Sequence, residues 1–276
     1  MKVLRLSAFP FNGVGGNPAG VVLDASDLTD SAMQEIAAEV GYSETVFVTS
    51  QEGNCLRVRY FSPEMEVDFC GHATVAAGVA IGEHRGSGNY IFETNTGEVA
   101  VDVSQTSDGY ITELTSHTGS VISIDNESLE RLLEIFGWQK SVLAEKYEPL
   151  IANAGNSHPV LVLESIDVLK NLNYDFEALK VICRENKWPT VQLVSQESSN
   201  VWRSRNPFAF GGVYEDPATG SAALAFGVYL RETNNAAPGD TFFIKQGLEM
   251  GQPCLLKVAV ALDFCTVSGT AIKIHH

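Results

Sequence analysis

Four side chains in this chain of 276 residues have the chemistry of proton transfer: Glu44, His72, Asp216 and Ser221. Glu44 lies in GYSETVFV, between an expected helix end and an expected strand. Partial burial there would raise the pKa of its carboxyl and let it carry protons near neutral pH. His72 opens an apolar segment. A helix N-terminus disfavours the cationic form of an imidazole, so we expect His72 to be neutral and to orient a substrate or relay a proton.

Two apolar segments must position these side chains, DFCGHATVAAGVAIGEH and EDPATGSAALAFGVYLRE. After their start, neither carries a charged side chain until Glu83 or Arg231. A helix without a polar stripe is buried on all sides, while its first turn leaves unpaired N–H groups and a positive dipole end. We therefore expect two buried helices whose N-termini, at 71–73 and 219–221, together bind one carboxylate.

The two segments align with a constant offset of 147 residues. This register matches Cys70 with Pro217, His72 with Thr219, Ala73 with Gly220 and Thr74 with Ser221. A two-base racemase needs an acid and a base on opposite faces of one carbon, which a pair of cysteines would supply. Because Pro217 lies opposite Cys70, the chain has only one such cysteine, and we expect Cys70 to be a small core residue.

The resemblance between the two halves extends beyond these segments. GNPAGVV at 16–22 resembles GNSHPVL at 155–161, and Arg57-Val58-Arg59 before Pro63 resembles Arg203-Ser204-Arg205 before Pro207. A repeat of this length favours a duplicated domain over a solenoid. We expect an α+β fold of two similar domains, each a barrel-like sheet around its own buried helix, with the active site in the cleft between them. The expected domains are 1–117, completed by a strand from 264–276, and 118–263.

Three further helices are expected from their apolar spacing and end signals. They span Ser31–Val40, with Ser31 and Gln34 as a capping box, Glu127–Phe136 and Asp175–Asn186. Alternating or apolar runs predict strands at LRVRYF, NYIFET, EVAVDV and PVLVLE, and closing strands at 257–260 and 264–274. The polar, turn-rich segment around 117–123 is the expected domain boundary.

Composition excludes several classes of function. The formal charge of −16 argues against binding to nucleic acid or to an anionic membrane surface. No apolar run is long enough to span a membrane and the N-terminus does not resemble a signal peptide, so we expect a cytoplasmic protein. Five scattered cysteines without a CxxC pair indicate reduced thiols. No dinucleotide, phosphate-loop or zinc motif occurs, and no metal or cofactor is expected.

The motifs GNPAGVV, YSET, FCGHATVAAG and EDPATGSA together resemble the PhzF-like phenazine-biosynthesis-type isomerase family, whose fold is related to that of diaminopimelate epimerase. They span most of the chain. The resemblance implies homodimers and cofactor-free proton shuttling on a small carboxylate-bearing substrate. It implies that Glu44 is the catalytic acid/base, with His72, Asp216 and Ser221 in support. Substrate binding is assigned to the following residues: Asn17, Gly71, Ala73, Thr219 and Gly220.

The sequence thus predicts an isomerase that moves a proton next to a carboxylate. His72 and Asp216 would orient the substrate, while Ser221 and the helix N-termini would stabilise the developing negative charge. Two alternatives remain open at this point. One is a one-base amino-acid racemase or epimerase that uses Cys70, and the other is a non-catalytic carboxylate-binding protein on the same fold.

Overall fold

The computed structural model describes residues 2–116 and 118–274. The chain divides into two compact units, Met1–Thr115 with Val267–His276 (unit 1) and Ser116–Thr266 (unit 2). The expected boundary at 117/118 involves His117, which lies outside the described residues. Each unit is an α+β structure with one extended mixed sheet, as the sequence predicts.

Unit 1 contains a sheet in the order β18-β1-β2-β3-β4-β6-β7-β8. β2–β3 and β4–β6 are parallel, and the other neighbours, β4–β5 among them, are antiparallel. The strands are β1 (Leu4–Ala8), β2 (Asn17–Val22), β3 (Glu44–Glu52), β4 (Cys55–Phe61), β5 (Glu66–Val67), β6 (Gly88–Thr94), β7 (Gly97–Thr106), β8 (Gly109–Thr115) and β18 (Ala271–Lys273). The late strand β18 pairs with β1, so the end of the chain belongs to this sheet.

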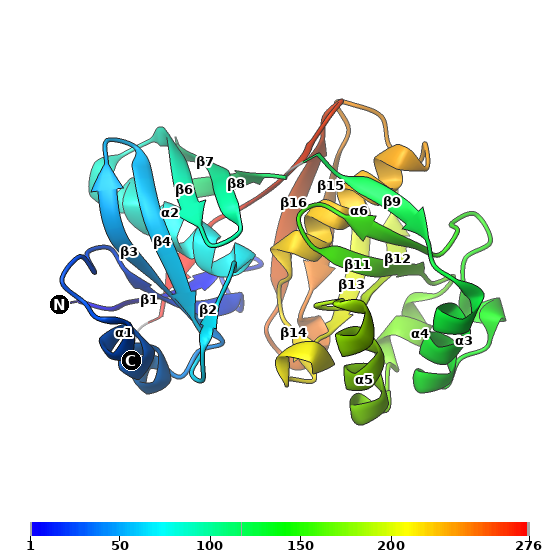
Figure 1. Ribbon diagram of the computed structural model, residues 1–276. Coiled ribbons are helices and arrows are strands. Elements are labelled where there is room, and N and C mark those ends of the chain that lie inside the picture. Colours follow the sequence, from blue (N-terminus) through cyan, green and yellow to red (C-terminus); the bar gives the residue numbers. More distant parts are fainter. Residues whose placement is uncertain (1, 117, 275–276) are drawn as a thin grey trace. The chain divides into compact units, whose positions relative to one another are not determined.

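Helix α2 (Gly71–Arg85) is the core of unit 1 (Figure 1). It contacts strands β1, β2, β3, β7, β8 and β18, and every residue from 72 to 82 is buried. The approach is close: a Cβ added at Gly78 would lie 2.5 Å from the side chain of Thr112 in β8. Helix α1 (Asp30–Val40) packs its apolar face on β3 and β4 through Met33 and Ala37. Helix α2, whose residues 71–82 carry no charge, is therefore surrounded by strands, as expected.

Unit 2 repeats this plan in the order β9-β10-β11-β12-β13-β15-β16. β11–β12 and β13–β15 are parallel, and the remaining pairs, including β13–β14, are antiparallel. The strands are β9 (Ser120–Ser123), β10 (Leu150–Asn153), β11 (Ser157–Val162), β12 (Gln192–Ser198), β13 (Val201–Pro207), β14 (Glu215–Asp216), β15 (Thr241–Gln246) and β16 (Cys254–Val260). Strand β17 (Cys265–Gly269) begins at the end of unit 2 and continues into unit 1. The buried helix is α6 (Gly220–Glu232), which contacts β9, β10, β11 and β16.

The outer helices of unit 2 are amphipathic and cover a second apolar cluster that includes Leu132, Leu179 and Ile182. They are α3 (Asn126–Ile135), α4 (Ile166–Lys170) and α5 (Phe176–Asn186), with short 3-10 turns η1 (Lys140–Val142), η2 (Ala209–Gly211) and η3 (Leu248–Met250). Asp125 and Asp175 cap α3 and α5 by accepting hydrogen bonds from backbone N–H groups, so both helices begin within one residue of their predicted starts.

One local prediction was wrong. Helix α1 is capped by Thr29, whose side chain accepts a hydrogen bond from the N–H of Ala32, so Ser31 lies inside the helix. The segment expected as the domain boundary contains β9, which pairs with β10, because its alternating polar residues suit a half-exposed edge of the sheet. Among the described residues, no helix is long and apolar enough to cross a membrane.

The register between the two buried helices also needs correction. The N-cap residues are Cys70 for α2 and Thr219 for α6, so His72 corresponds to Ser221 and Cys70 to Thr219, not to Pro217. The sequence alignment was two residues out because the small residues of both segments match almost equally well in several registers. The conclusion that only one half carries a cysteine at this position is unchanged.

Strand pairing fixes the rest of the correspondence. Arg59 and Arg205 each bind a glutamate of the next short strand, Glu66 and Glu215 respectively. Arg59 lies opposite Phe47 in β3, and Arg205 lies opposite Leu193 in β12. Counting back three residues from Phe47 and from Leu193 matches Glu44 with Thr190.

Candidate active site

Glu44 and His72 lie together in unit 1. Glu44 is the first residue of β3, and His72 is the second residue of α2. The Oε2 atom of Glu44 is 3.3 Å from Nε2 of His72, and the two side chains are only 13% and 5% exposed. The structure thus brings the predicted acid/base and the predicted imidazole into contact, in surroundings that largely exclude water.

Burial raises the pKa of the Glu44 carboxyl, against smaller opposing effects of hydrogen bonds from Ser43 and Cys70. Ser43 Oγ also lies 3.4 Å from His72 Nε2, and Cys70 Sγ lies 3.3 Å from His72 Nδ1. A carboxyl with a raised pKa is suited to give and take protons near neutral pH. Cys70 is buried, as expected, but it is more than a packing residue, since its sulfur contacts both proton-carrying groups.

The same three side chains could hold a metal ion. One potential ligand atom from each of Glu44, Cys70 and His72 lies within 4.8 Å of the other two. A thiolate, an imidazole and a carboxylate form a donor set that suits Zn²⁺. A bound metal would occupy the groups that otherwise exchange protons. The sequence predicts no metal because it contains no zinc motif, and Glu44, the third potential ligand, is far from Cys70 along the chain.

Asp216 and Thr219 form a polar arm before α6 in unit 2. The hydroxyl of Thr219 donates a 2.6 Å hydrogen bond to Oδ2 of Asp216. Gln246 of β15 binds both residues: its Nε2 donates to the Asp216 carbonyl at 2.7 Å, and its Oε1 accepts from the Thr219 N–H at 3.3 Å. Asp216 is the last residue of β14 and precedes α6, which begins at Gly220.

Ser221, the second residue of α6, bonds to a histidine that the sequence reasoning missed. Ser221 Oγ lies 3.2 Å from Nε2 of His158, whose Nδ1 faces Thr190. Full burial lowers the pKa of His158 to about 4. The only sequence signal for His158 was its place in GNSHPVL, the counterpart of the GNPAGVV segment that starts β2.

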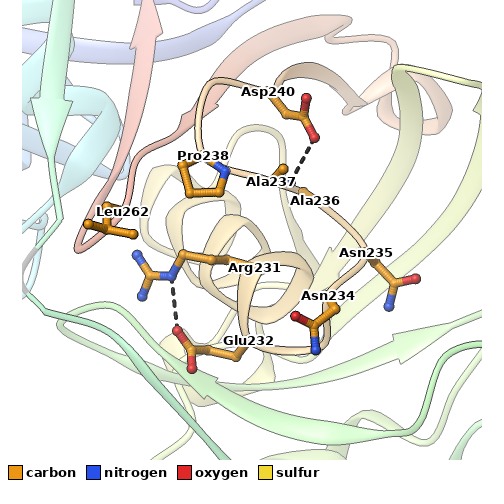
Figure 2. Close-up of a pocket in the computed structure, with 9 residues that line it drawn as sticks. All are labelled: Arg231, Glu232, Asn234, Asn235, Ala236, Ala237, Pro238, Asp240 and Leu262. Carbon is orange, nitrogen blue, oxygen red and sulfur yellow. Dashed lines mark hydrogen bonds and ion pairs between the residues drawn. The ribbon is translucent and has the colours of Figure 1, made fainter.

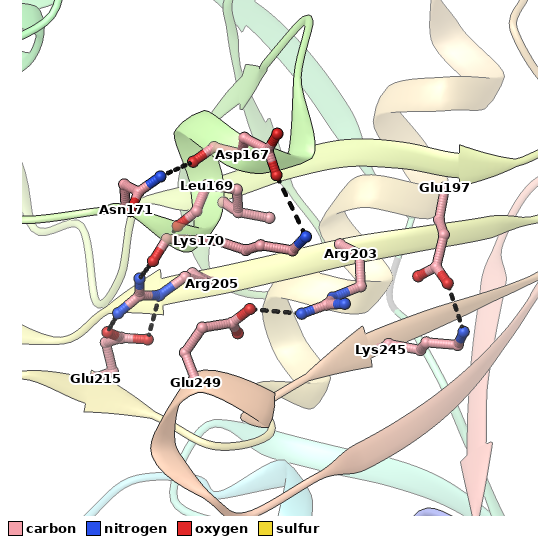
Figure 3. A network of polar contacts seen from close by, with 10 residues as sticks. All are labelled: Asp167, Leu169, Lys170, Asn171, Glu197, Arg203, Arg205, Glu215, Lys245 and Glu249. Atoms are coloured by element: carbon pink, nitrogen blue, oxygen red, sulfur yellow. Dashed lines mark hydrogen bonds and ion pairs between the residues drawn. The ribbon is translucent and has the colours of Figure 1, made fainter.

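A buried ion pair holds β14, the short strand that carries Asp216. Arg205 of β13 binds Glu215 of β14 through two nitrogens and also donates to the carbonyls of Leu169 and Lys170 (Figure 3). Both charged side chains are nearly inaccessible to water. Such bidentate pairs fix geometry as well as charge. The pair therefore fixes the strand whose last residue is Asp216.

The predicted substrate-binding residues all lie at the starts of inner elements. Asn17 is the buried first residue of β2, Gly71 and Gly220 are the first residues of α2 and α6, and Ala73 and Thr219 are buried at the same helix starts. Helix starts provide backbone N–H groups that suit an anion.

Two pockets within the units do not contain these residues. In unit 2 a pocket of about 570 Å³ lies at the end of α6, where Arg231 pairs with Glu232, and Asp240 accepts from the Ala237 N–H (Figure 2). In unit 1 a pocket of about 740 Å³ lies at the other end of α2, beside His84 and Arg85. Both are at the C-terminal ends of the buried helices, away from the helix starts that carry the predicted chemistry.

Comparison with known proteins agrees with the motifs. The model of the phenazine biosynthesis-like protein family PhzC-PhzF matches residues 6–276. An uncharacterized isomerase of Clostridium acetobutylicum is 34% identical over 95% of this chain and 90% of its own. The trans-2,3-dihydro-3-hydroxyanthranilate isomerase of Pseudomonas fluorescens is 31% identical over 91% of this chain and 87% of its own.

Solved structures show the same fold. A phenazine biosynthesis protein of the PhzF family from Bacillus anthracis is similar with a TM-score of 0.87 and 26% identity, over 100% of this chain and 98% of that one. A probable proline racemase from Agrobacterium radiobacter K84 is similar in fold alone, with a TM-score of 0.67 and 10% identity over 99% and 90% of the two chains. Extensive sequence matches and isomerase relatives lead to one conclusion: the chain belongs to the phenazine biosynthesis-like PhzC-PhzF family and is an isomerase.

Proposed function

We propose that this isomerase moves a proton within a small carboxylate-bearing substrate, with Glu44 as the group that removes and returns it. The observation that carries the proposal is the buried contact between Glu44 and His72, 3.3 Å apart, in which burial raises the pKa of Glu44. A base must be basic enough to take a proton and weak enough to return it, and such a carboxyl meets both needs. His72 orients the carboxyl.

The start of α2, at 71–73, and the start of α6, at 219–221, each offer backbone N–H groups that suit a substrate carboxylate, and Asp216 lies beside the second. The protein carries a net charge of −16, so long-range attraction cannot bring an anion to it, and local N–H dipoles must. The family resemblance supports this assignment and also a homodimer, which light scattering of the purified protein tests. No cofactor takes part in the proposed proton transfer.

The relative from Pseudomonas fluorescens is named for trans-2,3-dihydro-3-hydroxyanthranilate, a cyclic carboxylate that also bears an amine and a hydroxyl group. This compound heads the panel of substrates to test, followed by small dicarboxylates and amino acids. Each is incubated with the protein in D₂O, and deuterium uptake is followed by mass spectrometry. We expect exchange at a carbon near the carboxylate of at least one compound.

Two variants separate the proposal from its rivals. Glu44→Gln should lower the exchange rate by at least about 10²-fold, because it removes the acid/base while keeping the shape of the side chain. Cys70→Ser should retain most of the rate. An inactive Cys70→Ser beside an active Glu44→Gln would instead establish a racemase that uses the cysteine. Saturable binding without any exchange would establish a binding protein.

A further inference from the structure

We propose that His158 is a positioning residue that makes the Ser221 hydroxyl a hydrogen-bond acceptor toward the substrate, and that the substrate therefore carries an N–H or O–H group beside its carboxylate. The second part rests on the proposed function, since it requires that the substrate binds at the start of α6. The first part concerns the protein alone.

The surroundings of Nδ1 determine where the proton of His158 resides. This atom lies 3.3 Å from the carbonyl oxygen of Thr190 and 3.0 Å from its Oγ1. A carbonyl oxygen can only accept, so the proton belongs on Nδ1. A neutral imidazole carries one ring proton, and Nε2 must then accept. The atom within its reach is Ser221 Oγ at 3.2 Å, which consequently donates its proton to the ring.

The remaining hydrogen bonds of this buried network run in a consistent direction. The Thr190 hydroxyl donates to Oδ1 of Asn206 at 2.9 Å, and Nδ2 of Asn206 donates to Ser204 Oγ at 3.0 Å. If a second proton bound to His158, its Nε2 would donate to Ser221 Oγ instead of accepting from it. Full burial lowers the pKa of His158 to about 4, so the ring stays neutral over the physiological range.

A Ser221 hydroxyl that donates to His158 has only lone pairs left for another molecule. Turning its proton toward a substrate carboxylate would leave the fully buried Nε2 without a donor, which is unfavourable. Ser221 is partly exposed, whereas His158 is not. The hydroxyl is therefore suited to an amine or hydroxyl of the substrate. The stabilisation of negative charge that the sequence assigned to Ser221 falls to the backbone N–H groups of the helix start.

The internal duplication shows which side chains of unit 2 replace Glu44 and His72 of unit 1. Glu44 corresponds to Thr190, and His72 corresponds to Ser221. In unit 1 the strand partner of Glu44 is Ala19, whereas the register of β11 with β12 places His158 beside Thr190. The first half thus contains two groups that exchange protons in direct contact. In the second half, two hydroxyl groups are connected by an imidazole whose acceptor nitrogen faces α6.

The tautomer can be measured without a substrate. Long-range ¹H–¹⁵N NMR of the intact protein distinguishes a protonated from an unprotonated ring nitrogen. We expect His158 to be protonated on Nδ1 alone from pH 5 to pH 8. Thr190→Val should leave this tautomer unchanged, because the backbone carbonyl remains. A proton on Nε2 in the native protein, or a change of tautomer in Thr190→Val, would overturn the assignment of Ser221 as an acceptor.

Two ligands of equal charge test the consequence for the substrate. Anthranilate has an amine beside its carboxylate, and benzoate lacks it. Calorimetry should show that anthranilate binds about two- to tenfold more tightly, the usual range for one hydrogen bond. Ser221→Ala should abolish the preference for anthranilate. Ser195→Ala changes a buried serine of β12 that does not belong to this hydrogen-bond network, and it should keep the preference. Equal binding of the two ligands, or binding of neither, would overturn the inference that the substrate carries an N–H or O–H group beside its carboxylate. Deuterium exchange with Glu44→Gln tests the proposed function separately.

Discussion

The buried His158 should make the folded protein sensitive to acid. Its pKa is about 4 in the fold, compared with an ordinary value of 6.5, because burial opposes the charged ring. Between these two pH values the unfolded chain binds more protons than the folded one, so stability falls as the pH falls. Each pKa unit corresponds to about 1.4 kcal/mol, and the shift therefore contributes about 3 kcal/mol. The contribution is complete above pH 6.5 and is lost below pH 4.

Urea unfolding at pH values from 4 to 8 measures this loss. The native chain is compared with His158→Gln, which keeps a side chain able to form hydrogen bonds but cannot titrate. His158→Gln is expected to be less stable at pH 8, since it disturbs a fully buried site, and the gap should narrow by about 3 kcal/mol towards pH 4. His84→Gln, at an exposed histidine, is the control and should follow the native chain. A gap that does not change with pH would refute the reasoning.

Three further outcomes are expected. Arg205→Met should destabilise the fold by about 3–5 kcal/mol in urea unfolding, because it leaves the buried carboxylate of Glu215 without its partner, and the double change with Glu215→Leu should recover much of the loss. Glu44→Gln should gain stability relative to the native chain as the pH rises from 4 to 8, because a raised pKa means that the ionised carboxylate is disfavoured in the fold; a constant difference would contradict this. Gly78→Ala should destabilise by about 1–3 kcal/mol in thermal unfolding, since its Cβ would meet Thr112 at 2.5 Å, and Thr112→Ala should relieve the clash; an unchanged melting temperature would contradict the close packing.

The pattern of charges in the sequence predicted the cores well. A segment without charges from Gly71 to Gly82 has no face to offer to water, and the structure surrounds it with strands. Glu44 and His72 were each identified from their own surroundings, since one begins an expected strand and the other begins the buried helix, but their contact was not predicted. Such information is local, and it survives in a single sequence.

Relations between distant residues were harder to predict. The alignment of the two halves failed by two residues, since runs of glycine and alanine carry little positional information. The helix caps Cys70 and Thr219 and the strand pairs fixed the register only in the structure. His158 was missed for a related reason. Its importance depends on Thr190 and Ser221, which are 32 and 63 residues away along the chain.

The duplicated halves keep their frame and differ in their chemistry. Arg59 with Glu66, and Arg205 with Glu215, join the same two strands in each unit and so place the start of the buried helix. The side chains at the start of the buried helix differ in chemical type between the two units.

Unit 1 has a carboxyl, an imidazole and a thiol in mutual contact, whereas unit 2 has hydroxyl groups and a neutral, fully buried imidazole. A reaction that needs one group to remove and return a proton requires only the first set. The second set cannot readily change its charge near neutral pH, because its imidazole is held neutral by burial. A group that keeps its protonation state is suited to hold a substrate in one orientation while a different group exchanges the proton. This difference between the halves agrees with the proposed function, in which Glu44 is the group that removes and returns the proton.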